Sequence, residues 1–118
     1  MLVFDATTIA SLFDSYREPW TAWKRANEDR LKIGFPTTAM VEAAKIAGVR
    51  KSAWEAFLWA PGVEVLPLGA TAAVEIGEWP GLTIASRHAL WEAMQMNCPL
   101  MTRDAGLYAP GIVPIIVV

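Results

Sequence analysis

The sequence contains a single cysteine, Cys98, and a single histidine, His88. One cysteine cannot form an internal disulfide, and a zinc site built from cysteines is excluded. Because Cys98 stands in an apolar stretch, we interpret it as a small buried residue in a reducing, cytoplasmic setting. Basic charge is also scarce, with 10 Lys and Arg against 12 Asp and Glu. Any contact with RNA therefore needs a local basic patch or a metal ion.

Long hydrophobic runs are missing as well. No charge-free apolar run reaches the roughly 18 residues that a membrane-spanning helix needs. The closest candidate, residues 57–74, is interrupted by Glu64 and by two prolines. The first residues carry no basic segment before their apolar stretch, and Asp5 interrupts that stretch early. We therefore expect neither a signal peptide nor contact with a membrane.

Apolar and aromatic residues are abundant instead, with 54% hydrophobic residues and six Trp among 118 residues. This length predicts one domain, residues 1–118, with one core. A core of this size has difficulty in burying six indoles, so we expect some of them at an interface with a second chain. For any single Trp, burial in the core is the favoured alternative. Two predicted helices carry the candidates for the interface, which are Trp20, Trp23, Trp54 and Trp59.

Short apolar segments alternate with helical patterns along the chain. Strands are predicted at 1–5, 63–66, 99–102 and 112–118, and Pro114 indicates an edge position for the last strand or marks its very start. Helices are predicted from Thr7 or Thr8 to Phe13, and over 18–31, 37–47, 49–60, 70–79 and 84–96. The segment 34–36 is interpreted as a break between two helices. This order predicts an α/β fold with a mostly parallel central sheet of four to five short strands flanked by helices.

Two acids come directly after predicted buried strands. Asp5 follows the apolar residues 2–4, and Asp104 follows residues 100–103. Functional sites in open α/β sheets form beyond the carboxyl ends of the strands, so both acids are expected to point into one crevice. Either acid alone is explained equally well as a cap of a helix or turn. The pair together favours a functional site.

Glu42 is the third candidate, because it lies in the apolar helical segment 39–44. An acid among small apolar neighbours must reach solvent, a cation or a metal ion, and a solvated helix face beside Lys45 is the alternative. If Asp5, Glu42 and Asp104 converge, their like charges repel one another. Mg²⁺ or Mn²⁺ suits such a site, with water and substrate phosphate completing the coordination. An ion of this kind activates water and stabilises charge on a phosphodiester.

Three segments resemble the PIN-domain family, in particular its VapC-like toxin ribonucleases. Residues 1–8 resemble the family's first strand, with its acid and the hydroxyl residue after it. Residues 38–42 resemble its acid-bearing helix, and residues 89–104 its closing alanine-rich helix, short strand and Thr-x-Asp signature. The resemblance covers nearly the whole chain and implies a three-layer PIN-like fold. It also implies a metal-dependent endoribonuclease, the toxin of a toxin–antitoxin pair, with Mg²⁺ or Mn²⁺ held by Asp5, Glu42 and Asp104.

One position departs from the family pattern. The family carries another Asp 18 residues before the Asp of Thr-x-Asp, and here that position is Ser86. His88 lies two residues further on, roughly 200° around a helix, so it cannot take the same place. The sequence is therefore consistent with a weakened hydrolase in which Ser86 and Thr102 orient water. The alternative is a catalytically impaired PIN-like domain that binds RNA or a partner protein without cutting.

Partners are expected from the same resemblance, which implies RNA as substrate, a homodimer and an antitoxin protein. Arg87 and Arg103 flank the proposed site, and their guanidinium groups match the geometry of RNA phosphates; ordinary surface charge is the alternative for each. A receiver-like phosphoacceptor domain is disfavoured. Asp5 stands alone after the first strand, and no Lys follows Lys51.

Overall fold

The computed structural model describes all residues, 1–118. Five parallel strands form one sheet in the order β3-β2-β1-β4-β5, and helices cover both faces. This confirms the α/β prediction and is compatible with a three-layer PIN-like fold. Along the chain the elements are β1 (Leu2–Phe4), α1 (Ala6–Phe13), α2 (Arg17–Glu28), β2 (Ile33–Pro36), α3 (Thr37–Ala47), α4 (Lys51–Leu58), β3 (Val63–Leu66), α5 (Ala70–Ile76), α6 (Ile84–Met96), β4 (Leu100–Thr102) and β5 (Ile115–Val117).

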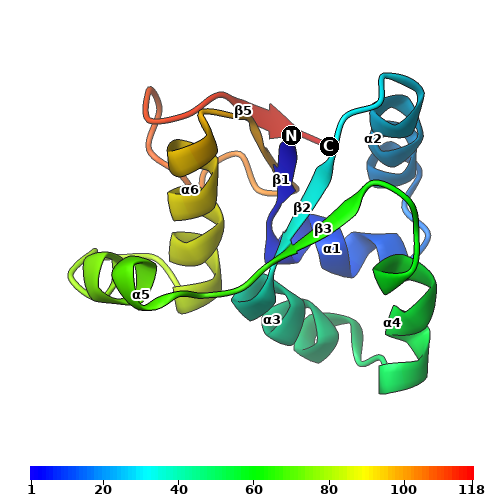
Figure 1. Cartoon of the computed structure of the whole chain (residues 1–118), viewed down its shortest axis with the longest axis horizontal. Helices are drawn as coiled ribbons and strands as arrows, with labels where there is room; N and C mark the ends of the chain where they lie inside the picture. Colours follow the sequence, from blue (N-terminus) through cyan, green and yellow to red (C-terminus); the bar gives the residue numbers. More distant parts are fainter.

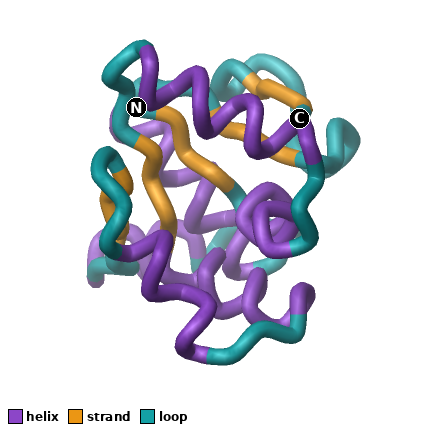
Figure 2. Tube along the Cα trace, turned by 90° about the vertical axis from the view of Figure 1, so that its right-hand side faces the viewer, coloured by secondary structure: helices purple, strands orange, loops and turns teal.

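The two faces of the sheet carry different helices. Figure 1 shows α6, with α5 beside it, on one side of the strands, and α1, α2 and α4 on the other. Seen from the side in Figure 2, helical segments (purple) pass in front of and behind the strands (orange). Because side chains alternate along a strand, Val3 and Leu100 pack with α6, while Phe4 and Met101 pack with the helices opposite. None of the helices has the length and apolar character needed to cross a membrane.

The strand β2 corrects the sequence prediction, which interpreted its residues as a break between helices. The glycine and proline in Ile33–Pro36 are turn signals, yet all four residues are buried between β1 and β3. Gly34 is needed there because a Cβ atom would lie 2.8 Å from Leu66 Cδ1 and 3.0 Å from Met1 Sδ. Close packing, rather than a turn, explains the glycine. The last strand lies at the sheet edge, as Pro114 predicts.

Aromatic residues fill much of the core between the sheet and helices α1, α2 and α4. Trp23 and Trp54 are buried there, against Phe4, Phe13 and Phe57. Two of the four Trp expected at an interface therefore serve the chain's own core. Trp20 is partly exposed and stacks on Phe57, with its indole N–H donating to Leu12 O at 3.0 Å. Trp59, at the end of α4, is 86% exposed.

Candidate functional site

The sheet has a topological switch point between β1 and β4. From β1 the chain first adds β2 and β3 on one side, and then β4 and β5 on the other. In open parallel sheets, a crevice for ligands forms at such a point, outside the carboxyl ends of the strands. Asp5 directly follows β1 and Thr102 ends β4, so both lie at this point.

Asp5 is fully buried and begins α1 as its N-cap. The expected cap was Thr7 or Thr8, but these residues instead donate to Asp5. Its Oδ1 accepts from the Thr7 hydroxyl at 2.6 Å and from the Thr8 backbone N–H at 3.0 Å. Its Oδ2 accepts from the Tyr108 hydroxyl at 2.8 Å. A buried carboxylate is stable only with such donors, and here both oxygens have them.

Hydroxyl groups join the ends of the two central strands. The Thr7 hydroxyl also accepts from the backbone N–H of Arg103 at 2.9 Å and lies 3.3 Å from the Thr102 hydroxyl. The Thr8 hydroxyl donates to Met101 O at 3.0 Å. Thr102 is fully buried at this edge of the sheet. Most of the polar groups at the switch point are thus bonded to other protein groups.

Tyr108 is the residue of this site that the sequence analysis missed. It lies in the segment between β4 and β5, is 6% exposed, and packs with the α6 side of the core. Burial, together with the charges of Asp5 and Glu42, raises the pKa of Tyr108 well above its usual range. A hydrogen bond with Ser86 lowers the same pKa and does not cancel the rise. The hydroxyl therefore stays protonated and remains a donor to Asp5.

Two predicted residues on different helices, Glu42 and Ser86, influence the pKa of the same phenol. Glu42 is half-buried on α3, and its charge acts on the Tyr108 hydroxyl. Ser86 is buried in the first turn of α6. Thr83, the N-cap of α6, accepts from the Ser86 backbone N–H and donates to its side-chain oxygen, each at 3.1 Å. Asp5 accepts the hydrogen bond of the Tyr108 hydroxyl, while Glu42 and Ser86 act on its pKa.

Asp104 is exposed, unlike the other predicted acids. Its Oδ1 accepts from the Gly106 backbone N–H at 3.1 Å, and its own N–H donates to the Thr102 hydroxyl at 3.1 Å. These are the bonds of a carboxylate that caps its own turn, the alternative considered from the sequence. Its turn leads the chain towards Tyr108.

The two arginines beside the site are engaged by the protein. Arg87 donates from Nη1 to Ile76 O at 3.2 Å. The Arg103 guanidinium lies 4.5 Å above the Tyr16 ring, and its Nη1 is 3.6 Å from Glu18 Oε2. Glu18 is well exposed, so this ion pair is weak. Binding an RNA phosphate would compete with these contacts.

As they stand, these residues do not fit a divalent cation. No group of three or more His, Cys, Asp or Glu side chains lies close enough together to hold one. The oxygens of Asp5 already accept protein hydrogen bonds, Ser86 is neutral, and Asp104 caps its own turn. Mg²⁺ demands a near-octahedral set of oxygen ligands, and in this arrangement the oxygens of Asp5 accept bonds from protein groups instead.

Comparison with known proteins gives no family assignment. No family model matches the chain, and no curated protein has a significantly similar sequence.

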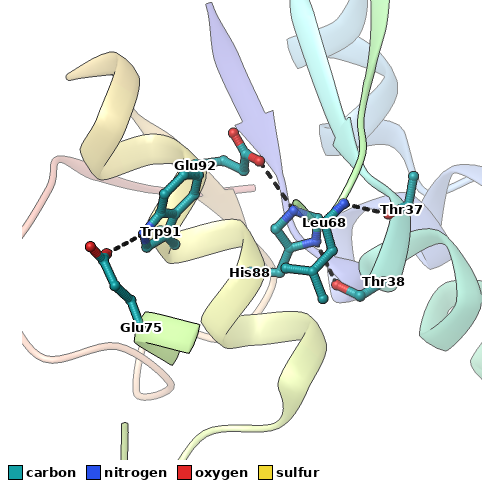
Figure 3. A network of polar contacts seen from close by, with 7 residues as sticks. All are labelled: Thr37, Thr38, Leu68, Glu75, His88, Trp91 and Glu92. Atoms are coloured by element: carbon teal, nitrogen blue, oxygen red, sulfur yellow. Dashed lines mark hydrogen bonds and ion pairs between the residues drawn. The ribbon is translucent and has the colours of Figure 1, made fainter. Parts of the chain in front are cut away.

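A second buried polar cluster joins α3 to α6, one turn from Glu42. Figure 3 shows His88 between Thr38 and Glu92, with Nδ1 2.7 Å from the Thr38 hydroxyl and Nε2 3.1 Å from Glu92 Oε1. Because a carboxylate only accepts, Nε2 donates to Glu92, and in the neutral ring Nδ1 accepts from Thr38. Burial lowers the pKa of His88, and Glu92 partly offsets this.

An apolar groove lies away from the acidic crevice, between α2 and strands β1, β4 and β5. Its volume is about 600 Å³. Apolar lining residues include Leu31, Ile116 and Val117, and each of these side chains is more than one third exposed. Its charged lining residues are two of each sign, Arg17 and Arg25 with Glu18 and Asp29. The edge strand β5 forms one wall of the groove.

Proposed function

We propose that this chain is a PIN-like domain of the toxin–antitoxin type that binds a protein partner and does not cut RNA. One observation carries the proposal: both oxygens of Asp5 accept hydrogen bonds from Thr7, Thr8 and Tyr108. The carboxylate on which a PIN-like cation site would depend is thereby satisfied by neutral donors. Ser86, in place of a further acid, removes a ligand of the same site.

The charge distribution favours a protein partner over RNA. The net charge is −2, Arg87 donates to a backbone carbonyl, and Arg103 forms a weak ion pair with Glu18. A surface that binds RNA needs free basic groups to replace the counterions of the phosphates. The groove beside β5 is mainly apolar, and its charged lining residues are balanced in sign, which suits a segment that is apolar. We propose an antitoxin-like segment as its partner.

The test of the proposal is an RNA cleavage assay with Mn²⁺, comparing the native chain with Asp5→Asn. We expect no metal-dependent cleavage by either protein. RNA binding, followed by fluorescence anisotropy, is expected to be weak and unchanged by Arg103→Ala. Cleavage by the native chain that Asp5→Asn abolishes would overturn the proposal.

A metal-dependent endoribonuclease is the second candidate, and that cleavage result would establish it. It is favoured by the position of Asp5 at the switch point of the sheet and by the influence of Glu42 on the neighbouring Tyr108 hydroxyl. With Asp104 they are the acids that the PIN resemblance assigns to Mg²⁺ or Mn²⁺. Such an enzyme must rearrange the crevice before it can hold the ion.

A homodimer is a separate part of the proposal. Trp59 is 86% exposed and adjoins Leu58, which is 43% exposed. Exposed aromatic and aliphatic side chains of this kind are enriched at the centre of protein interfaces. Sedimentation of the native chain beside Trp59→Lys tests this part, because a dimer through this surface would become monomeric in the variant.

A further inference from the structure

The edge strand β5 is covered by the chain on one face only. On the α6 face, Ile115 packs with the core cluster. On the opposite face, Phe4 of β1 and Phe35 of β2 are fully buried, and Met101 of β4 is 4% exposed. Ile116 of β5 is in register with Met101 and points to the same face, but it is 39% exposed. The cover of this face therefore ends between β4 and β5.

The path of the chain explains why this part of the sheet is uncovered. The strand β5 is added on the opposite side of β1 from β2 and β3. A right-handed connection from β4 to β5 must then cross the α6 face, and Leu107, Tyr108 and Val113 of that connection do pack there. No helix follows α2 in the layer that α1, α2 and α4 form (Figure 1). The groove beside α2 thus corresponds to an unfilled helix position in this layer.

The α2 wall of the groove carries charges that the chain itself does not use. Arg17, Arg25 and Asp29 line the groove at separations of eight and four residues, so they lie along one side of the helix. None of these three forms an ion pair within the chain. The fourth charged lining residue, Glu18, already pairs weakly with Arg103. An occupant can therefore pair with two cations in a row and with one anion beyond them.

We propose that an amphipathic helix of a partner protein fills this groove, beside α2 and over β4 and β5. Its apolar stripe covers Met101, Ile116 and Val118. One flank carries two acids eight residues apart, which face Arg17 and Arg25, and a base four residues outside the second acid. These positions span about 13 residues, or roughly 20 Å of helix. The inference deepens the proposed function and rests on it, since it states the conformation and charges of the protein partner.

Two other occupants fit the groove less well. A strand added to β5 would meet only three strand residues, preceded by Pro114, which has no N–H group. Short edge strands and proline both limit strand addition. A strand in the plane of the sheet would also leave the face with Ile116 open. A second copy of the chain lacks the matching charges, because no two of its acids are eight residues apart.

The experiment measures the binding of three synthetic peptides of about 16 residues to the native chain by fluorescence anisotropy. The matched peptide has a leucine stripe at helical spacing, two glutamates eight residues apart on one flank and a lysine four residues beyond. The swapped peptide exchanges glutamate and lysine, and the broken peptide carries a central proline. We expect the matched peptide to bind roughly tenfold more tightly than the swapped one, because three exposed ion pairs change sign. The broken peptide should bind more weakly than the matched one, because proline interrupts a helix.

Variants of the chain locate the binding site. Arg25→Glu should weaken the matched peptide roughly tenfold, and lysine in place of the facing glutamate should restore its affinity. Lys24→Glu is the matched control, because it reverses the neighbouring charge on α2 outside the groove. Ile116→Asp should weaken binding, and Val74→Asp, at an exposed residue on α5, should not. If Ile116→Asp does not fold, Arg25→Glu on the exposed side of α2 still decides the question.

Equal affinity for the matched and swapped peptides, or an equal loss in Lys24→Glu, would overturn the proposal. So would the absence of binding by all three peptides at millimolar concentration. Sedimentation of the native chain tests the second copy: a dimer that Ile116→Asp dissociates would place another copy of the chain in the groove, against the proposal.

RNA cleavage separates this inference from the proposed function. A native chain that cuts RNA and binds the matched peptide refutes the proposed function alone. A native chain that does not cut RNA and binds the broken peptide as tightly as the matched one refutes the helical partner alone.

Discussion

The chain has two buried polar clusters, which differ in the titratable group at their centre. At the carboxyl end of the sheet, Asp5 accepts bonds from Thr7, Thr8 and Tyr108. Between α3 and α6, His88 bridges Thr38 and Glu92. The first cluster contains a carboxylate without access to water. The second contains a ring whose lowered pKa keeps it neutral.

The comparison teaches that burial of a titratable group does not by itself identify a functional site. His88 is fully buried and joins two helices, α3 and α6. Asp5 lies where the strand order reverses, the position at which α/β sheets bind ligands. Only the Asp5 cluster therefore combines a buried charge with a position suited to function.

The largest expected change in stability comes from a substitution that breaks the Asp5 cluster. Asp5→Ala removes the N-cap of α1 and leaves the donors of Thr8 and Tyr108 unpaired, so we expect the free energy of unfolding to fall by about 3 kcal/mol. Urea denaturation measures this fall in the free energy of unfolding. Asp5→Asn, which keeps the shape and an acceptor oxygen, is the matched control with a smaller loss. If Asp5→Asn instead raised the stability, the carboxylate would be held in an unfavourable state, as expected of a vacant cation site.

The next largest expected change in stability comes from removing the Tyr108 hydroxyl alone. Tyr108→Phe removes one hydrogen bond to a buried carboxylate, and such bonds contribute about 2 kcal/mol. The loss should appear in urea denaturation at neutral pH. Tyr16→Phe is the control. Because the Tyr16 ring is half exposed, this substitution should lower the free energy of unfolding only slightly. Equal losses of unfolding free energy in Tyr108→Phe and Tyr16→Phe would contradict a stabilising hydrogen bond between Tyr108 and Asp5.

A smaller effect is expected in the second cluster. Thr38→Val keeps the shape but removes the hydroxyl that donates to His88 Nδ1, at a cost of about 1 kcal/mol. Thr21→Val serves as a matched change, since the Thr21 hydroxyl is exposed and bonded only within its own helix turn. A Thr38→Val protein as stable as the native chain would mean that His88 does not depend on this bond.

The sequence predicted the fold class because apolar strands and helical patterns alternate clearly along the chain. It also predicted the helix over 84–96, where α6 lies, and the edge position of β5. It missed β2, because Gly34 and Pro36 are turn signals that only the packing against Leu66 explains. Helix starts were less certain, since Thr7, Thr8 and Asp5 all suit an N-cap.

The candidate site could be predicted in part. Asp5 and Thr102 were proposed from their positions at strand ends, and both contact Thr7 at the switch point of the sheet. Glu42 and Ser86 were proposed from their positions on helices, and both influence the pKa of Tyr108. Tyr108 could not be predicted. It lies in a segment rich in glycine and proline, and its partner is 103 residues away. The only signal was an aromatic hydroxyl residue shortly after the Thr-x-Asp segment.

The smallest expected effect is a pH dependence that separates the two clusters. Burial lowers the pKa of His88 in the folded chain below its unfolded value of about 6.5, so the unfolded chain binds the proton first. The stability due to neutral His88 is complete above that pH and falls as the pH drops towards the folded pKa. The loss is modest, because Glu92 faces the ring and favours its charged form. Urea denaturation between pH 7 and 5 should show this loss in the native chain and not in His88→Asn, whereas Tyr108→Phe should retain it. Parallel pH profiles for native and His88→Asn would mean that His88 does not titrate on unfolding in this range, and the contrast between the clusters would then fail.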